Sequence, residues 1–183
     1  EDSFLGGLEE NQDWDVQVYI KPDAEESVLD WAENNSAEYE IIIEMPLGLV
    51  TDSEDIDRSF NLVGLDSFQS GMRPISISEG NIPSANETLP QVMMDEGSMQ
   101  FLRWSVGEKH TVKINGAPQD IEIVGISTAE LARTMYFLRE DLSEIIGVNA
   151  TSIYLQLSEG VMVDSNLGEI STGIVERQTL LDG

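Results

Sequence analysis

The sequence predicts an α+β fold: a β-α-β lobe, split along the chain, that receives a β-rich lobe as an insertion. Both ends of the chain alternate apolar and polar residues beside amphipathic helical stretches, which is typical of strands packed on helices. The middle of the chain holds mostly strand-like runs. With 183 residues and 40% apolar residues, the chain can bury a core. We assign residues 1–65 and 136–183 to the split lobe and residues 66–135 to the inserted lobe.

The split lobe is predicted to begin with a strand and a helix. Residues 1–13 have the apolar spacing of a helix end, and residues 14–20 alternate as a half-buried strand. A helix follows, for which we predict Asp23 as the N-cap and Glu26 as its capping-box partner. The Asn-Asn-Ser tripeptide at Asn34 ends this helix.

Two more strands complete this β-α-β-β segment. Residues 38–45 alternate as a strand, which the Pro-Leu-Gly tripeptide starting at Pro46 bends or breaks. An acidic turn over residues 51–57 leads into a strand over residues 59–65. The next residues connect this segment to the inserted lobe.

The inserted lobe is predicted to contain a short helix and a tight β-hairpin. Asp95 lies near the start of the helix. Residues 110–114 and 121–124 alternate as strands, and Asn115-Gly116 between them supplies the positive φ angles of a two-residue hairpin turn.

The C-terminal part returns to the split lobe. Its predicted elements, in chain order, are an irregular segment over residues 128–135, a strand at 135–137, a helix at 139–146 closed by Gly147, a strand at 152–157, a helix at 164–175 and a last strand at 176–183. Gly168 and Gly173 each disfavour the last helix by about 1 kcal/mol relative to alanine.

The chain is strongly acidic, with nine basic and 35 acidic residues, a net charge of −26, and lysine only at Lys21, Lys109 and Lys113. The acids are interspersed with periodic apolar residues, which predicts a folded chain and not a disordered tail. Self-repulsion of this size is screened where the Debye length falls to about 3 Å, near 1 M salt, so we expect a haloarchaeal protein. An acidic extracellular domain from another organism is the alternative. Such a surface argues against nucleic-acid binding.

The sequence contains no run of 18 apolar residues, and therefore predicts no membrane-spanning helix. We expect no signal peptide, because Glu1-Asp2 has the wrong charge for its first region. The chain has no cysteine, so thiols do not indicate its compartment.

Residue types that perform catalysis are scarce, and we expect no enzyme. His110 is the only histidine, at the start of a predicted strand, and neither a cysteine nor a G-x-S-x-G segment is present to pair with it. A single histidine also excludes the usual zinc sites, and no phosphate-binding glycine loop occurs. We therefore predict no catalytic, cofactor-binding or metal-binding residues and no cofactor.

The acidic turn over residues 52–57 does not match the calcium-binding EF-hand pattern. Counted from Asp52, positions 5, 6 and 12 are Ile56, Asp57 and Val63, where the pattern requires an oxygen ligand, glycine and glutamate. Because these three positions differ from the pattern, we expect the turn to be a solvated acidic loop. An irregular cation site in this loop, and with it a hydrolase using an acidic metal site, stays open as an alternative.

Several apolar residues admit either a core or a recognition role, and we predict the core for them. These residues are Trp14, Trp31, Trp104, Met93, Met94 and Met99. Three Asn-x-Ser/Thr tripeptides in predicted loops or element ends are possible N-glycosylation sites, at Asn34, Asn86 and Asn149.

Short motifs follow one another along most of the chain. The residues that carry them are Trp14, Asp15, Val16, Glu79, Gly80, Pro83, Val106, Gly107, Glu108, Val112, Ile114, Asn115, Gly116, Val124, Gly125, Ile126 and Tyr136. Together they resemble the extracytoplasmic domain of FtsX/MacB-like permeases of ABC transporters, known as the MacB-like periplasmic core domain. The chain departs from the family at Asn81, where arginine is usual, and at Glu108, where aspartate is commoner.

The resemblance implies a porter-like α/β lobe, split in sequence, with an inserted β-rich lobe. It implies that the motif residues are structural, and that the domain lies on the extracellular or periplasmic side of the cell membrane. There it would couple ATP-driven motion, through movement of rigid lobes, to mechanotransmission or to export or release of a lipid, lipoprotein, peptide or drug. The implied partners are an ATP-binding subunit, a second permease and an unknown substrate, with no nucleic acid. A stand-alone extracellular binding or adhesion module of a halophile is the alternative.

Overall fold

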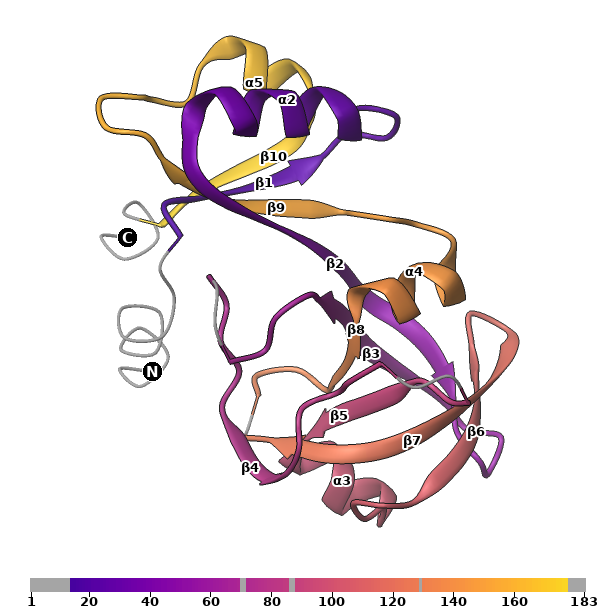
Figure 1. The fold of residues 1–183 in the computed structure, drawn as a ribbon. Helices are drawn as coiled ribbons and strands as arrows, with labels where there is room; N and C mark the ends of the chain where they lie inside the picture. The colour runs from indigo at the N-terminus through magenta and orange to yellow at the C-terminus, as the bar shows by residue number, and fades with distance from the viewer. Residues whose placement is uncertain (1–13, 70–71, 86–87, 129, 178–183) are drawn as a thin grey trace. The chain divides into compact units, whose positions relative to one another are not determined.

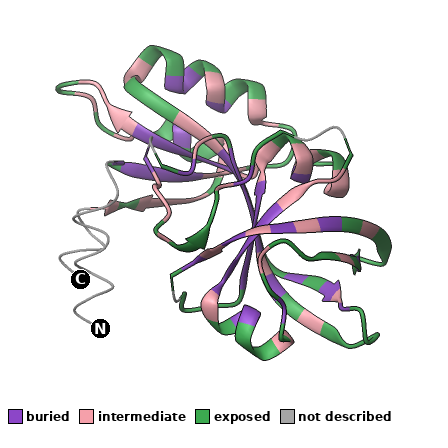
Figure 2. Ribbon diagram, turned by 60° about the horizontal axis from the view of Figure 1, so that its bottom comes forward, coloured by how far each residue is buried: buried purple, intermediate pink, exposed green. Residues whose placement is uncertain are grey.

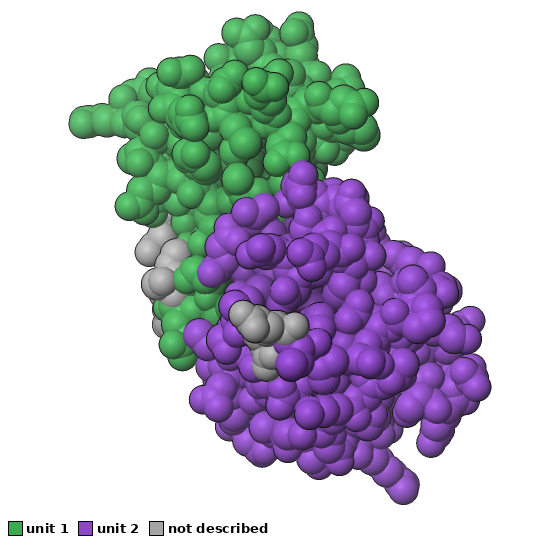
Figure 3. All heavy atoms as spheres, turned by 45° about the vertical axis from the view of Figure 1, so that its right-hand side comes forward, with its two compact units in different colours: residues 1–42, 67–74, 150–183 green, residues 43–66, 75–149 purple. Residues whose placement is uncertain are grey.

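The computed structural model describes residues 14–69, 72–85, 88–128 and 130–177, so the helix end predicted in residues 1–13 lies outside the described residues. The chain combines short helices with mixed β-sheet, which confirms the predicted α+β class (Figure 1). It divides into two compact units, coloured in Figure 3: unit 1 is residues 1–42, 67–74 and 150–183, and unit 2 is residues 43–66 and 75–149.

Unit 1 is an antiparallel sheet with two helices. Its strand order is β10-β1-β9-β2, of which β2 contributes its first half. Figure 1 shows α2 and α5 over one face of this sheet. The elements are β1 (Val16–Ile20), α2 (Glu25–Asn35), β2 (Ser36–Thr51), β9 (Ser152–Leu157), α5 (Ser165–Glu169) and β10 (Ser171–Glu176).

The core of unit 1 lies between the sheet and its helices. Val18, Val28 and Leu155 are fully buried there, on β1, α2 and β9. Trp31 is 8% exposed, as the core prediction requires, and its indole N–H donates to the carboxylate of Asp164 at 3.2 Å. Figure 2 shows how buried and exposed positions alternate along the strands.

The start of α2 differs from the prediction. The helix begins at Glu25, its N-cap is Ala24, and no side chain caps it. Asp23 adopts a left-handed conformation with φ of 67°, whereas an N-cap residue that accepts from the first turn is typically extended. The predicted capping box of Asp23 and Glu26 is therefore wrong. The helix ends at Asn35, as predicted.

The predicted helix over residues 164–175 is also wrong. The structure has only the five-residue helix α5, whose N-cap Asp164 accepts from the amide of Leu167. The chain then extends as β10 and pairs with β1, with Val18 opposite Ile174. Gly173 disfavours the helix, and the β-branched Ile174 and Val175 favour a strand once a partner strand is present.

Unit 2 is built on six strands that close into a ring. Each strand pairs with the next in the order β2-β3-β8-β5-β7-β6, and β6 pairs back to β2. The short strand β4 pairs with the free part of β7. The strands not yet given are β3 (Asp57–Leu65), β4 (Ile77–Gly80), β5 (Gln91–Asp95), β6 (Lys109–Ile114), β7 (Ala117–Ser127) and β8 (Thr134–Leu138).

Apolar side chains of these strands form the core of unit 2. Fully buried Leu62, Met94 and Ile121 come from β3, β5 and β7. Two helices contribute to the same core: α3 (Glu96–Leu102) through Met99, and α4 (Arg139–Ile146) through Leu142. The bounds of α4 and its closure by Gly147 match the prediction.

The boundaries of the units differ from those of the predicted lobes. Residues 43–65 and 136–149, which the sequence predicts in the split lobe, belong to unit 2. Residues 67–74, which it predicts in the inserted lobe, belong to unit 1. The physical reason is the strand pairing. The second half of β2 pairs with β3, and β3 pairs in parallel with β8, which closes the ring of unit 2.

Candidate functional site

The first and last described residues of the chain meet on two paired strands of unit 1. Val16 at the start of β1 lies opposite Glu176 at the end of β10. One residue further out, the amide of Arg177 donates to the carbonyl of Asp15 at 2.9 Å. The described chain therefore enters and leaves the fold at one place. Figure 1 draws these two segments next to each other.

The Trp-Asp-Val motif fixes this place. Trp14 is 3% exposed, and its ring lies 5.2 Å from that of Tyr154, centroid to centroid. The amide of Asp15 donates to the carbonyl of Leu155 at 2.8 Å, and the carboxylate of Asp15 accepts from the amide of Leu157 at 3.0 Å. Val16 packs into the core. The motif therefore attaches the start of β1 to the end of β9.

A second group of motif residues meets on β7 in unit 2. Gly80 on β4 lies opposite Gly125 on β7, and Glu79 lies opposite Ile126. A Cβ atom on Gly125 would lie 2.1 Å from the carbonyl oxygen of Asn81, so any larger residue would clash with the backbone. The Glu-Gly and Val-Gly-Ile motifs, far apart in sequence, are thus the two sides of one strand pairing.

The Val-Gly-Glu motif forms the turn before β6. Gly107 has φ of 95°, and its amide donates to the carbonyl of Ile123 on β7 at 2.7 Å. The carboxylate of Glu108 accepts from the amide of Ser105 at 3.0 Å and contacts His110. These two hydrogen bonds hold the pKa of Glu108 below its ordinary value.

The Asn-Gly motif makes the hairpin turn that was predicted. Asn115 and Gly116 have φ of 50° and 89°, as a turn with positive φ at both positions requires. The side-chain oxygen of Asn115 also accepts from the amide of Leu49 at 3.2 Å, which connects the turn to β2. Tyr136, the last motif residue, is 1% exposed on β8 and donates to Glu130.

Asp95 does more than cap a helix, because its carboxylate also binds the backbone of a neighbouring strand. It caps α3 by accepting from the amide of Ser98 at 3.0 Å. Its other carboxylate oxygen accepts from the hydroxyl of Ser98 and, at 2.9 Å, from the amide of Thr134 on β8. A buried carboxylate thus joins three elements. The sequence signal was the N-cap pattern alone, which does not reveal the partner on β8.

The acidic turn between β2 and β3 is organised by its own first residue. The carboxylate of Asp52 accepts from the amides of Glu54 and Ile56 and from the guanidinium of Arg58 at 2.9 Å. Burial raises the pKa of Asp52, but these hydrogen bonds outweigh it and leave that pKa below its ordinary value. No cluster of carboxylates and histidine that could hold a metal ion occurs among the described residues.

His110 stacks on Trp104, with ring centroids 4.0 Å apart. The tryptophan and methionine residues predicted for the core are all buried.

Two of the three possible glycosylation sites are described, and both are exposed: Asn34 in the last turn of α2 and Asn149 after α4. Asn86 lies outside the described residues.

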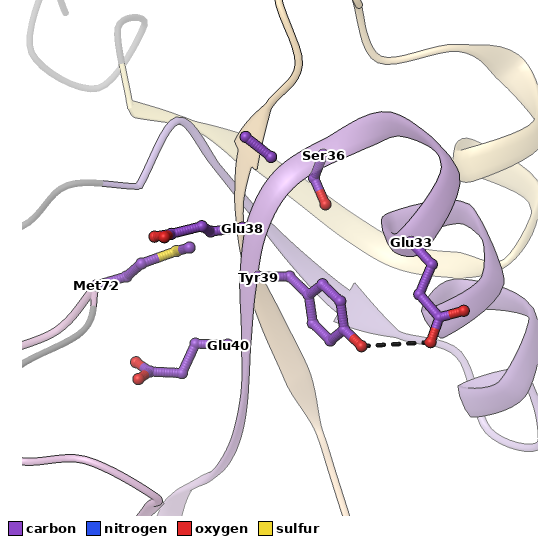
Figure 4. Close-up of a pocket in the computed structure, with 7 residues that line it drawn as sticks. Glu33, Ser36, Glu38, Tyr39, Glu40 and Met72 are labelled. Carbon is purple, nitrogen blue, oxygen red and sulfur yellow. Dashed lines mark hydrogen bonds between the residues drawn. The ribbon is translucent and has the colours of Figure 1, made fainter.

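Each unit has one groove of interest. The groove of unit 1, about 380 Å³, is lined by Glu33, Ser36, Glu38, Tyr39, Glu40 and Met72 (Figure 4). Its phenol and one of its carboxylates are joined, because the hydroxyl of Tyr39 donates to Glu33 at 3.4 Å. The groove of unit 2, about 710 Å³, lies beside α3 and is lined in part by the motif residues Glu79 and Ile126.

Solved structures with a similar fold are known. The chain matches the extracellular domain of the noncanonic ABC-type transporter YknZ from Gram-positive bacteria over 93% of both chains, with a TM-score of 0.58 and 16% identity. It matches the periplasmic region of MacB from Actinobacillus actinomycetemcomitans over 91% of this chain and 90% of that one, with a TM-score of 0.57 and 14% identity. No family model and no curated protein matches the sequence.

These neighbours are the extracellular domain of an ABC-type transporter and the periplasmic region of MacB, and this chain shares their α+β fold over nearly its whole length. Among the described residues, no helix combines the length and the apolar character that crossing a membrane requires.

Proposed function

We propose that this chain is the extracytoplasmic domain of a permease subunit of an ABC transporter. The observation that carries the proposal is the pairing of the two ends of the described chain, Asp15 with Arg177, on a fold shared with such domains. A domain inserted between two membrane helices must receive and return the chain at one face of the membrane. Paired ends meet that requirement.

In this proposal the domain transmits motion and performs no chemistry. ATP is bound by a separate cytoplasmic subunit or domain, and its hydrolysis moves the membrane helices next to the two chain ends. The motion enters unit 1 through β1 and β10, and the two units move as rigid bodies. The outcome is export or release of a substrate, or mechanotransmission to a partner outside the membrane. A permease dimer is the proposed assembly.

We further propose that the domain works in concentrated salt outside the cell. A net charge of −26 with nine basic residues repels itself strongly in dilute solution. The described ion pairs that could offset the repulsion are few, such as Arg58 with Asp52 and Arg139 with Asp66. An extracytoplasmic location also makes the exposed Asn34 and Asn149 candidates for N-glycosylation.

The location can be tested with cysteine labelling, because the chain has no cysteine of its own. The full-length protein, with any cysteine outside this chain replaced, carries Ser27→Cys on the exposed face of α2. We expect a membrane-impermeant maleimide to label it in intact cells. Ser152→Cys, at a fully buried position, is the matched control and should react only after denaturation.

A cytosolic marker protein monitors the integrity of the cells. If Ser27→Cys reacts only after lysis, together with the marker, the domain faces the cytoplasm and the proposal is wrong. If it reacts in intact cells but the protein neither copurifies with an ATP-binding subunit nor carries an ATP-binding domain of its own, a stand-alone extracellular module is the better description.

A further inference from the structure

The groove of unit 2 has the size and lining of a ligand site that the proposed function does not use. Its volume of about 710 Å³ falls within the range of small-molecule sites, about 300–1,000 Å³. Glu79 and Ile126, opposite each other on β4 and β7, line it from the sheet. From α3 and the turn after it come Glu96, Met99, Arg103 and Trp104.

Arg103 is unusual among the arginines of the chain. Its side chain is exposed and makes no hydrogen bond, ion pair or ring contact with any described residue, while its backbone amide donates to the carbonyl of Gln100. The other five arginines all have at least one such interaction. In a chain with 35 acidic residues, a guanidinium without a carboxylate partner is left available for a ligand.

The fold itself gives no reason for arginine at this position. Arg103 ends α3 in the left-handed conformation, with φ of 59°, and the amide of Trp104 donates to the carbonyl of Met99 at 3.1 Å. Glycine is the residue that most often ends a helix in this way, because it adopts positive φ without strain. Arginine here costs backbone energy and supplies a positive charge at the edge of the groove.

We propose that this groove binds a short peptide with a free carboxylate, a free amino group and an apolar side chain. The planar guanidinium of Arg103 suits a carboxylate, with which it can form two parallel hydrogen bonds. The half-buried Ile126 and the small exposed edge of Trp104 provide apolar surface for the side chain. The carboxylates of Glu79 and Glu96 suit an ammonium group.

Glu79 and Glu96 disfavour the binding of a fatty acid, or of another amphiphile that carries only a negative charge. Such a ligand would have its single charge in a groove with two carboxylates and nothing to pair with them. A peptide has both charges and an amide backbone. This inference does not rest on transport, since a stand-alone module with the same groove would bind the same ligand.

The test is a titration of the ¹⁵N-labelled chain with the tripeptide Ala-Leu-Leu, followed through the indole N–H signals in NMR spectra. The chain has three tryptophans, and loss of one signal in Trp104→Phe assigns the signal of Trp104. We expect Ala-Leu-Leu to shift this signal saturably and to leave those of Trp14 and Trp31 unchanged. Its C-terminal amide and its N-acetyl form should bind at least about tenfold more weakly.

Three variants separate the role of Arg103 from general effects of charge and folding. Arg103→Gly removes the guanidinium at a position where glycine favours the fold, and should weaken binding about tenfold or more while the protein stays folded. Arg103→Lys should bind with intermediate affinity. Lys109→Gln changes the net charge equally, outside the groove, and should bind Ala-Leu-Leu as the unmodified chain does.

Two results would overturn the proposal. One is no shift of the Trp104 signal at about 10 mM Ala-Leu-Leu, a concentration at which a millimolar complex would be mostly formed. The other is equal binding by the unmodified chain and Arg103→Gly. Octanoate is included as a probe for amphiphiles. If it shifts the signal and the tripeptide does not, the groove takes anionic amphiphiles and the peptide assignment is wrong.

Discussion

The backbone amide of Arg177 lies 2.9 Å from the carbonyl oxygen of Asp15, and this hydrogen bond holds the two ends of the described chain together. It continues the antiparallel register in which Val16 faces Glu176. The ends are also fixed from the other side of β1, where the carboxylate of Asp15 accepts from the amide of Leu157. Movement applied at either end would therefore act on the same sheet.

A disulfide between the two ends tests this register. Val16 and Glu176 are directly opposite, and the bond from Arg177 to Asp15 makes them a non-hydrogen-bonded pair, whose Cα separation of about 4.5 Å permits a disulfide. We expect Val16→Cys with Glu176→Cys to oxidise readily and to stabilise the fold by about 3 kcal/mol relative to the reduced form. Non-reducing electrophoresis and thermal unfolding measure both effects.

The matched control pairs Val16→Cys with Ile174→Cys, two residues out of register. It should form little disulfide under the same conditions. Equal oxidation of the two pairs would contradict the register of β1 and β10.

The close contact between β4 and β7 leads to a prediction on Gly125. Gly125→Ala would place a Cβ atom 2.1 Å from the carbonyl oxygen of Asn81, a backbone atom that cannot move without breaking the strand pairing. We expect a loss of about 3 kcal/mol in the free energy of unfolding, measured by urea denaturation. Gly168→Ala is the control, since its Cβ meets nothing within 4 Å and should change stability by about 1 kcal/mol or less.

If Gly125→Ala were as stable as Gly168→Ala, the close approach of the two strands would be absent in solution. Close contact between the strands would then not explain why the Glu-Gly and Val-Gly-Ile motifs contain glycine.

Some elements of the fold could be predicted from the sequence and others could not. Local signals sufficed for α4 and for the hairpin turn at Asn115 and Gly116, because caps and turn residues are read from neighbouring positions. They failed for β10, whose partner strand β1 lies at the other end of the chain. They also missed β4 and β5, since β4 is only four residues long and the consecutive apolar residues of β5 do not distinguish strand from helix.

The candidate sites could likewise be predicted from the sequence only in part. The motif residues could be found in the sequence, but their meeting on β7 depends on long-range pairing such as Gly80 with Gly125. The groove at Arg103 had no sequence signal, because neither the left-handed φ of that residue nor the lack of a partner for its side chain among the described residues follows from residue types.

Asp52 gives a pH-dependent prediction. Its pKa in the folded protein lies below the ordinary value of 3.8, so its ionised form contributes stability above pH 3.8, which is lost as the pH falls through the lower folded pKa. Asp52→Ala should lose about 2 kcal/mol at pH 7, because the carboxylate accepts from two amides and from Arg58. The loss should shrink when unfolding is measured below about pH 3.

Glu54→Ala removes an exposed carboxylate from the same turn and serves as the control. It should change stability by about 0.5 kcal/mol or less at either pH. A loss for Asp52→Ala that is the same at both pH values would show that the ionised carboxylate is not what stabilises the turn.

The acidic surface predicts a strong dependence of stability on salt. Raising KCl from 0.15 M to 2 M shortens the Debye length from about 8 Å to below about 3 Å and screens the repulsion among the carboxylates. We expect the melting temperature to rise by about 5–10 °C, which corresponds to about 2–3 kcal/mol for a chain of this size. A variant with Glu26→Gln, Asp30→Asn and Glu54→Gln should show a smaller rise. An equal rise would mean that salt acts through burial of apolar surface and not through charge.

We propose that ATP hydrolysis in the membrane assembly moves this domain. The most direct measurement places spin labels at Ser27→Cys in unit 1 and Ser53→Cys in unit 2, both exposed, in the intact transporter. Distances are compared between the nucleotide-free and vanadate-trapped states. A pair within unit 2, Ser53→Cys with Ser105→Cys, should keep its distance distribution as the rigid-body control. We predict that the distribution between the units shifts on trapping. An unchanged distribution in a transporter that hydrolyses ATP would contradict the claim.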